Sequence, residues 1–219
     1  MSPESTVNRF DHVYWLGGNG CSGKSTIANI LAQRFPFEIH HGDGWRKHIP
    51  RAKPDNHPVM CQIRDGLYGK EDLFMSPPEQ QVHGMTKLYR ENFSFVLQDL
   101  EAMPEDQLVL VEGGQMLPEL VQTVAGPSHC IFLISANEFI RKYNLSRNAE
   151  TKHYQDLPDP QLALENRIAA FDLLGKRVYD SAHKIGFRTF AVDGTTPPER
   201  VADLVATHFK LAGVENKSV

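Results

Sequence analysis

Apolar residues follow two different periods along this chain, and the two periods alternate. Five short runs are continuously apolar or alternate between apolar and polar residues, as β-strands buried on one or both faces do. They predict strands at residues 13–16, 37–41, 108–111, 130–134 and 188–192.

Between these runs, apolar residues recur every three or four positions, which is the period of a helix with one buried face. The predicted helices cover residues 24–34, 77–103, 117–124, about 137–148, 160–185 and 199–211. The alternation of strands and helices predicts an α/β fold, a three-layer αβα doubly wound parallel sheet of five strands with right-handed crossovers.

Some helix ends are marked by capping residues. Asp159 is the expected N-cap of the long helix, Pro160 its first residue, and Gly186 lies just past its end. Ser135 or Asn137 is the expected cap of the helix that follows the fourth strand. Residues after 213 are expected to fray.

Two segments interrupt the pattern. Residues 45–76 contain Pro50, Pro54 and Pro58 and no clear period, so we expect short helices that form a cap beside the sheet. A polar, irregular stretch runs from about residue 147 to 158. We therefore interpret residues 1–219 as a single domain with an approximate cap at 44–76 and an approximate lid at 141–160.

The strongest local motif lies between the first strand and the first helix. Residues 18–26 read GNGCSGKST and match the spacing G-x-x-x-x-G-K-[ST] of a phosphate-binding loop. Glycines let the backbone amides approach phosphate, at the positive end of a helix dipole. Lys24 reaches the β- and γ-phosphates, and the Ser25 hydroxyl is a ligand for Mg²⁺. The expected nucleotide-binding residues of this loop are Gly18, Asn19, Gly20, Cys21, Ser22, Gly23, Lys24, Ser25 and Thr26.

Two carboxylates follow strands whose carboxyl ends share an edge with this loop. Asp43 follows the second strand, and we expect it to orient an acceptor hydroxyl or take its proton; the alternative is a turn or cap aspartate. Glu112 ends the third strand, where it would hold a water on Mg²⁺ or bind an acceptor hydroxyl; the alternative is a carboxylate paired with a nearby cation. Ser25 and Glu112 are thus the expected metal-site residues.

These residues also carry a family resemblance. The loop at 18–26, Asp43 in HGDGW and the stretch EGGQMLPELV at 112–121 resemble the nucleoside- and nucleotide-kinase-like P-loop proteins. That group includes adenylate, shikimate, gluconate and adenylylsulfate kinases and chloramphenicol phosphotransferase. The last stretch is similar to one in uncharacterised bacterial small-molecule kinases. The resemblance implies strand order 2-3-1-4-5, ATP across the loop, and an acceptor between the cap and the sheet edge, near Gly113 and Gly114.

The resemblance also implies roles for residues elsewhere. Lid cations that close over the γ-phosphate would come from Arg141, Lys142 and Arg147; the alternative for each is a solvated surface cation. Positions 141 and 147 do not share a helix face, so we expect only one of them to point at phosphate. We favour Arg147 because it begins the irregular lid. The turn containing Gly194 and Thr195 would pack against adenine. Together with Lys24 and Asp43, one of these lid arginines completes the expected catalytic set. The remaining basic residues at the acceptor would be Arg46, Arg51 and Arg64, although a basic cap surface is the alternative.

Composition narrows the class of protein. The 219 residues are 41% hydrophobic and 23% charged, with a net charge of −4 and no long basic run, which argues against non-specific nucleic-acid binding. The N-terminal residues are polar and lack the apolar core expected of a signal peptide, and no apolar run approaches the length of a bilayer span. The three cysteines lack any C-x-x-C pair and indicate free thiols in a reducing cytoplasm. The expected partner is a small-molecule acceptor, with no nucleic acid and no membrane, and the protein is expected to be a monomer or homodimer.

Three functions remain open. The first is an ATP- and Mg²⁺-dependent phosphotransferase that acts on a hydroxyl of a small molecule. The second is a nucleoside or nucleoside-monophosphate kinase. The third is a nucleotide-binding regulatory protein without turnover. A GTPase switch is disfavoured because the chain has no N-K-x-D sequence, and ATP is the default nucleotide.

Overall fold

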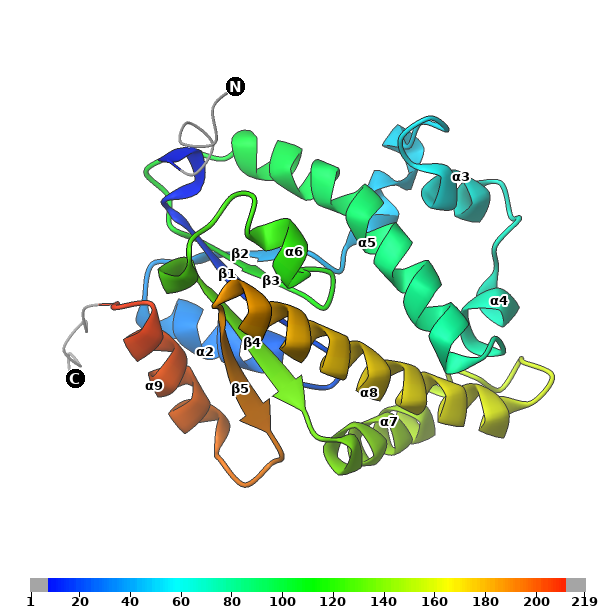
Figure 1. Cartoon of the computed structure of the whole chain (residues 1–219). Coiled ribbons are helices and arrows are strands. Elements are labelled where there is room, and N and C mark those ends of the chain that lie inside the picture. Colours follow the sequence, from blue (N-terminus) through cyan, green and yellow to red (C-terminus); the bar gives the residue numbers. More distant parts are fainter. Residues whose placement is uncertain (1–7, 212–219) are drawn as a thin grey trace.

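The structure, a computed structural model, describes residues 8–211, and its centre is a five-stranded sheet (Figure 1). The strands are β1 (Val13–Gly18), β2 (Glu38–His41), β3 (Val109–Glu112), β4 (Cys130–Ser135) and β5 (Arg188–Val192). They lie in the order β2-β3-β1-β4-β5, and every neighbouring pair is parallel. This confirms both the predicted strand positions and the predicted order 2-3-1-4-5.

Helices cover the sheet on both faces because side chains along each strand alternate between two cores. Trp15 points into a core shared with α5 (Pro78–Glu101), α6 (Pro118–Val121) and α8 (Pro160–Ile185). Its neighbour Leu16 points into the other core, with α2 (Lys24–Arg34) and α9 (Pro198–His208). Figure 1 shows α8 crossing in front of the sheet and α2 behind it. The three-layer αβα architecture is therefore as predicted.

Three short helices form the cap between β2 and α5, as predicted. They are η2 (Trp45–Arg51), α3 (Pro58–Arg64) and α4 (Lys70–Phe74). The Glu91 carboxylate of α5 accepts hydrogen bonds from the backbone N–H groups of Val59 and Met60, at 2.9 Å each, which satisfies the free amides at the start of α3. The cap is thus attached to α5. Two further short 3-10 segments, η1 (Asn8–Phe10) and η3 (Pro127–His129), complete the described chain.

Two predictions about α7 (Asn137–Thr151) are wrong. Its N-cap is Ala136, without a side-chain bond, whereas Asn137 is already the first helical residue. Ser135 is used elsewhere: its hydroxyl donates to the Gly20 carbonyl at 3.0 Å. The helix also extends to Thr151, so Arg147 lies within it and does not begin an irregular lid.

Other helix ends test the capping rules directly. Asp159 accepts a 2.9 Å hydrogen bond from the Leu162 N–H, and Gly186 ends α8 with a φ of 88°, so both predictions are confirmed. The predicted helix at 117–124 is a single turn, Pro118–Val121. The tail expected to fray lies outside the described residues. Among residues 8–211, no helix combines the length and apolar character that crossing a membrane requires.

Candidate active site

The loop between β1 and α2 doubles back tightly, and two glycines permit it. Gly18 has a φ of 134°, and a Cβ there would lie 1.9 Å from the Leu133 carbonyl oxygen of β4. Gly23 has a φ of 77° directly before the first residue of α2. Any larger residue at Gly18 would push the loop away from the sheet, so this part of the motif is required by packing as well as by ligand approach.

Asn19 anchors the loop from behind. Its side chain accepts a 2.8 Å hydrogen bond from the Ser135 N–H and donates a 3.2 Å bond to the Phe171 carbonyl of α8. A Cβ on Gly175, one turn further along α8, would lie 2.5 Å from the Asn19 amide nitrogen. Asn19 is fully buried, and neither it nor Gly18 lines a cavity. Gly18 and Asn19 therefore lie on the side of the loop that packs against the protein, whereas residues 20–26 lie on the side that faces the cavities.

Lys24 is the buried cation of the loop. Its Nζ donates to the Asn19 carbonyl at 2.7 Å and to the Ser22 hydroxyl at 3.2 Å. Burial lowers the pKa of its ammonium, while the carboxylates of Asp43 and Glu112 raise it. The group is thus held close to two opposite charges, with its direction set by the loop backbone.

Ser25 and Glu112 face each other across the loop. The Ser25 hydroxyl lies 3.2 Å from each carboxylate oxygen of Glu112, which is 3% exposed, and His41 Nδ1 lies 2.7 Å from Glu112 Oε1. Hard oxygen donors of this kind suit Mg²⁺. No group of three His, Cys, Asp or Glu side chains within residues 8–211 is arranged to hold a metal unaided. A magnesium ion here would therefore take most of its ligands from phosphate and water.

Asp43 lies on the turn after β2, beside the same loop. A Cβ on Gly113 would come within 2.9 Å of Asp43 Oδ1, so the glycine makes room for the carboxylate. Asp43 is exposed to a cavity, yet the protein atoms packed around its carboxyl raise the pKa of that group. Lys24 lowers that pKa and Glu112 raises it, while backbone hydrogen bonds from the two residues after Gly113 lower it. The result is a carboxylate held more basic than an ordinary aspartate.

A buried amide fixes the position of the Asp43 turn. Asn92 of α5 donates from Nδ2 to the Gly42 carbonyl at 3.2 Å and to Gln115 Oε1 at 2.8 Å. Its Oδ1 lies 2.6 Å from His48 Nδ1. Because a carbonyl can only accept, the amide orientation is determined, and His48 Nδ1 must carry a proton. The turn, the loop after β3 and the cap are therefore joined through one side chain.

Asp99 continues this network to the cap surface. His48 Nε2 and Lys47 Nζ each lie 2.9 Å from Asp99 Oδ2, and Arg51 lies 3.1 Å from its other oxygen. Burial raises the pKa of Asp99, but the hydrogen bonds from these three partners outweigh that effect and hold it well below its usual range. The carboxylate is thus the electrostatic centre that holds η2 against α5.

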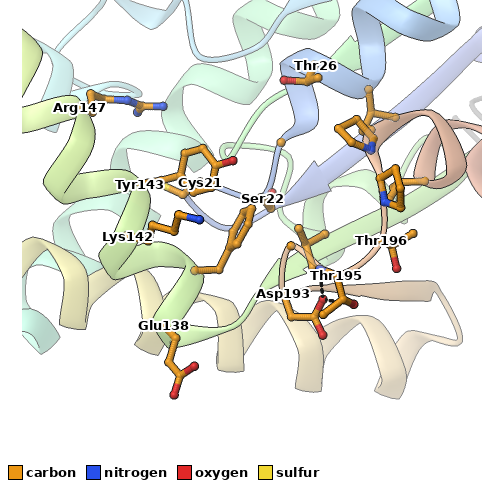
Figure 2. A pocket seen from close by; sticks show the side chains of 18 residues that line it. Cys21, Ser22, Thr26, Glu138, Lys142, Tyr143, Arg147, Asp193, Thr195 and Thr196 are labelled. Atoms are coloured by element: carbon orange, nitrogen blue, oxygen red, sulfur yellow. Dashed lines mark hydrogen bonds between the residues drawn. The ribbon is translucent and has the colours of Figure 1, made fainter.

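Two cavities meet at the phosphate-binding loop. One, of about 520 Å³, lies between the loop, α7 and the turn after β5, and Figure 2 shows Arg147 at its far end from Thr195 and Thr196. The other, of about 550 Å³, lies between the loop, the cap, α5 and α8. Five residues line both cavities: Cys21, Ser22, Gly23, Thr26 and Arg147.

The first cavity has a rigid end wall. Asp193 accepts hydrogen bonds from the Thr195 N–H at 2.9 Å and the Thr195 hydroxyl at 2.7 Å. Gly194 has a φ of 85°, and a Cβ there would lie 2.6 Å from the Phe139 ring. The turn is therefore held by its own aspartate and by close packing on α7. Gly194 and Thr195, predicted from the resemblance, both line this cavity.

Several predicted site residues are not brought to either cavity. Arg141 forms a two-bond ion pair with Glu165 at 2.8 and 2.6 Å, whereas Arg147, six residues later, faces the cavities. Arg51 is occupied by Asp99. Arg64 pairs with the adjacent Asp65 at 2.8 Å on the cap surface. Of the three cap arginines, only Arg46 lines the second cavity, together with Asp43 and Gly114.

The second cavity also contains residues that the sequence reasoning missed. They are Trp45, Tyr89, Gln115, His153 and Arg167. Arg167 carried a usable signal, because it lies three residues after Leu164 and four before Phe171, on the buried stripe of α8. A lone arginine on an apolar helix face indicates either an ion pair or a ligand.

Comparisons with known proteins bear on the fold. No family model and no curated protein sequence matches the chain. Among solved structures, TT1252 from Thermus thermophilus is 17% identical at a TM-score of 0.48, and covers 92% of this chain and 98% of its own. An uncharacterized protein from Eubacterium ventriosum is 12% identical at 0.43, covering 90% and 97%. A shikimate kinase from Acinetobacter baumannii in complex with shikimate is 13% identical at 0.41, covering 96% and 100%.

At these identities the likenesses concern architecture and say nothing of substrate. The sheet order and the loop geometry determine the classification. A parallel sheet in the order β2-β3-β1-β4-β5 joins β1 to α2 through a G-x-x-x-x-G-K-S loop. The protein therefore has a doubly wound αβα fold with a P-loop.

Proposed function

We propose that this protein is an ATP-dependent phosphotransferase that moves the γ-phosphate to a hydroxyl group of a small molecule. The observation that carries the proposal is the pair of cavities that share the phosphate-binding loop, with Lys24 and Asp43 on the wall of the second. A donor and an acceptor bound in these two spaces would meet where the shared residues lie, which is the arrangement that in-line transfer needs.

The first cavity is the proposed ATP site. Its end wall, the turn at Gly194 and Thr195, together with Phe139 and Tyr143, offers flat and backbone surfaces for the adenine. Its other end is the amide-rich loop, for the phosphates. Lys24 would bind the β- and γ-phosphates. Ser25 and Glu112 would hold Mg²⁺, which neutralises charge on the phosphate oxygens when it is bound.

The second cavity is the proposed acceptor site. The oxygen of the acceptor hydroxyl would form a bond to the γ-phosphorus, and Asp43 would take the proton of that hydroxyl. The bond between the γ-phosphorus and the oxygen that bridges it to the β-phosphate breaks, and ADP leaves. Its raised pKa makes it a better proton acceptor than an ordinary aspartate. Arg147, which lines both cavities, would stabilise the charge on the phosphoryl group in transit.

The other functions considered from sequence differ in what they require of the same site. A nucleoside or nucleoside-monophosphate kinase would place a second base or sugar in the acceptor cavity. A regulatory protein without turnover has no need for a carboxylate of raised pKa beside the loop. The presence of Lys24, Ser25, Asp43 and Glu112 together therefore favours turnover.

The proposal is tested by ADP formation. Purified protein is incubated with MgATP and a panel of sugars, hydroxy acids, hydroxylated antibiotics, nucleosides and nucleoside monophosphates, and products are identified by mass spectrometry. We expect one class to give acceptor-dependent ADP, and Lys24→Ala to abolish it while the melting temperature stays near that of the parent. Lys176→Ala, an exposed change on α8, is the control. Absence of ATP binding in calorimetry at millimolar nucleotide would overturn the proposal.

A further inference from the structure

The arginines of this protein divide into two sets. Seven of the twelve lie within 4.0 Å of a carboxylate: Arg9, Arg34, Arg51, Arg64, Arg90, Arg141 and Arg200. Five have no such partner within residues 8–211, and three of these five, Arg46, Arg147 and Arg167, line the acceptor cavity. Unpaired guanidinium groups are therefore concentrated in one cavity.

Arg167 is the most informative of the three because it is half-buried. Its guanidinium lies 4.3 Å from the ring centre of Phe171 and 5.3 Å from that of Phe74. Its Nη1 lies 3.0 Å from the Met85 sulfur, a weak acceptor. The planar group is thus held in place by aromatic rings and a thioether, none of which carries a compensating negative charge. A half-buried cation without a carboxylate partner is the kind of group that an anionic ligand would stabilise.

Arg46 reaches the same region from the cap. Its guanidinium lies 4.6 Å from the Trp45 ring centre. Arg46, His153 and Arg167 all line the cavity. Burial lowers the pKa of the His153 imidazole, Lys70, Arg167 and Arg46 lower it further, and Asp156 raises it. The cap and α8 therefore each contribute one arginine to the lining of this cavity.

The other charges around the cavity have roles in the proposed transfer. Lys24 and Arg147 lie at the loop, where the phosphates of the donor bind, and Asp43 is the carboxylate beside Lys24. Lys24, Arg147 and Asp43 thus have roles in the proposed transfer, which leaves the positive charges of Arg46 and Arg167 without one. Helices α5 and α8 also contribute apolar side chains to the lining, namely Met85, Leu88, Tyr89 and Leu174.

We propose that the acceptor is a small organic anion with an apolar body. Its carboxylate or phosphate would bind Arg167 and Arg46, its body would lie against Leu88 and Tyr89, and its hydroxyl would face Asp43. This inference rests on the proposed phosphotransferase function and specifies its substrate class. A guanidinium presents several donors in a plane and suits either anion, so the experiment must separate carboxylate from phosphate.

The first test measures anion binding with the phosphate-binding loop filled by a non-hydrolysable ATP analogue and Mg²⁺. Calorimetry then titrates malonate in one arm and inorganic phosphate in the other. We expect one of the two to bind and Arg167→Gln to weaken that binding about 10- to 150-fold, the range for a hydrogen bond to a charged group. Arg177→Gln is the matched control, because Arg177 is an exposed, unpaired arginine on the same helix outside both cavities.

The second test uses turnover. Each hydroxylated anion that supports ADP formation is compared with its uncharged methyl ester or amide, which we expect to be inactive. Arg167→Gln should raise the KM for the acceptor by the same 10- to 150-fold while the KM for ATP changes less than threefold. Arg46→Gln, on the exposed cap, should act in the same direction, and it replaces Arg167→Gln if that variant melts at a lower temperature than the parent.

The outcomes separate the two proposals. If the ATP analogue does not bind, the phosphotransferase proposal fails and the acceptor class falls with it. If the analogue binds but anion binding is the same in Arg167→Gln, Arg46→Gln and Arg177→Gln, only the acceptor class is wrong. The acceptor class would also be wrong if the protein turned over an uncharged acceptor and the KM for that acceptor were the same in Arg167→Gln, Arg46→Gln and the parent.

Discussion

Replacing Asn92 by leucine would remove the amide that joins the cap, the Asp43 turn and the loop after β3. Leucine has the same branching and the same number of side-chain heavy atoms, so the substitution keeps the outline of the side chain on α5 and deletes its hydrogen bonds. Three partners lose a bond: the Gly42 carbonyl at 3.2 Å, Gln115 Oε1 at 2.8 Å and His48 Nδ1 at 2.6 Å.

The size of the effect follows from which partners stay buried. Gln115 is also buried, at 2% exposure, but it lines the second cavity, so a water in that space can replace the lost bond and we count only the other two partners. The Gly42 carbonyl and the Nδ1–H of His48, which is 2% exposed, would be left without partners. Each unsatisfied buried group costs about 1–3 kcal/mol, so we expect the free energy of unfolding to fall by about 2–6 kcal/mol. For a chain of this size that lowers the melting temperature by roughly 4–24 °C.

Urea and thermal unfolding followed by circular dichroism measure this change. Gln80→Leu is the control: Gln80 is an exposed residue of the same helix, and its replacement should change stability by no more than about 0.5 kcal/mol. A loss below about 1 kcal/mol for Asn92→Leu would refute the reasoning, because it would mean that Gly42 and His48 find other partners.

Two further predictions concern the carboxylates on either side of that network. Asp43→Asn should reduce turnover by about 10²- to 10⁴-fold with ATP affinity retained. The fold raises the pKa of Asp43 above 3.8, the ordinary value for an aspartate in the unfolded chain. Ionisation of Asp43 therefore lowers the free energy of unfolding as the pH rises above 3.8. The variant should therefore be at least as stable as the parent at pH 7 in urea unfolding, and a clear destabilisation there would contradict this. Asp99→Asn should do the opposite, because a depressed pKa adds stability above the ordinary value that is lost as the pH falls below it. We expect a less stable variant at pH 7, with the difference shrinking below about pH 4; equal stability at pH 7 would count against the ion-pair cluster at Asp99.

The parts of the fold that could be predicted are those whose cause is local. A continuous apolar run such as residues 130–134 must be a strand buried on both faces, whichever strands pair with it. The ends of α8 were equally predictable, since Asp159 and Gly186 satisfy the helix termini from within a few residues. The cap of α7 was not, because Ser135 is drawn away by the Gly20 carbonyl, a contact between distant segments.

The same distinction holds in the candidate site. The phosphate-binding loop is one contiguous segment, so its chemistry can be interpreted from spacing alone. Arg46 and Arg51 belong to one short 3-10 helix, and only the position of Asp99 on α5 determines that Arg51 is occupied and Arg46 is free. The helical period marks Arg167 as a cation on the buried stripe of α8, but the cavity that it faces exists only because the cap, α5 and α8 meet there, which no local pattern encodes.

One consequence lies in the spacing along α8. Arg167, Phe171 and Gly175 are four residues apart, so they form a single stripe about 12 Å long, at 1.5 Å per residue. Gly175 and the Phe171 carbonyl seat Asn19 of the loop, while Arg167 stands in the acceptor cavity. Deleting one residue between Arg167 and Phe171 would rotate Arg167 about 100° around the helix axis, while Phe171 and Gly175 kept their contacts with Asn19. One helix thus keeps the phosphate-binding loop and the second cavity in register, so its length matters as much as the residues on this stripe.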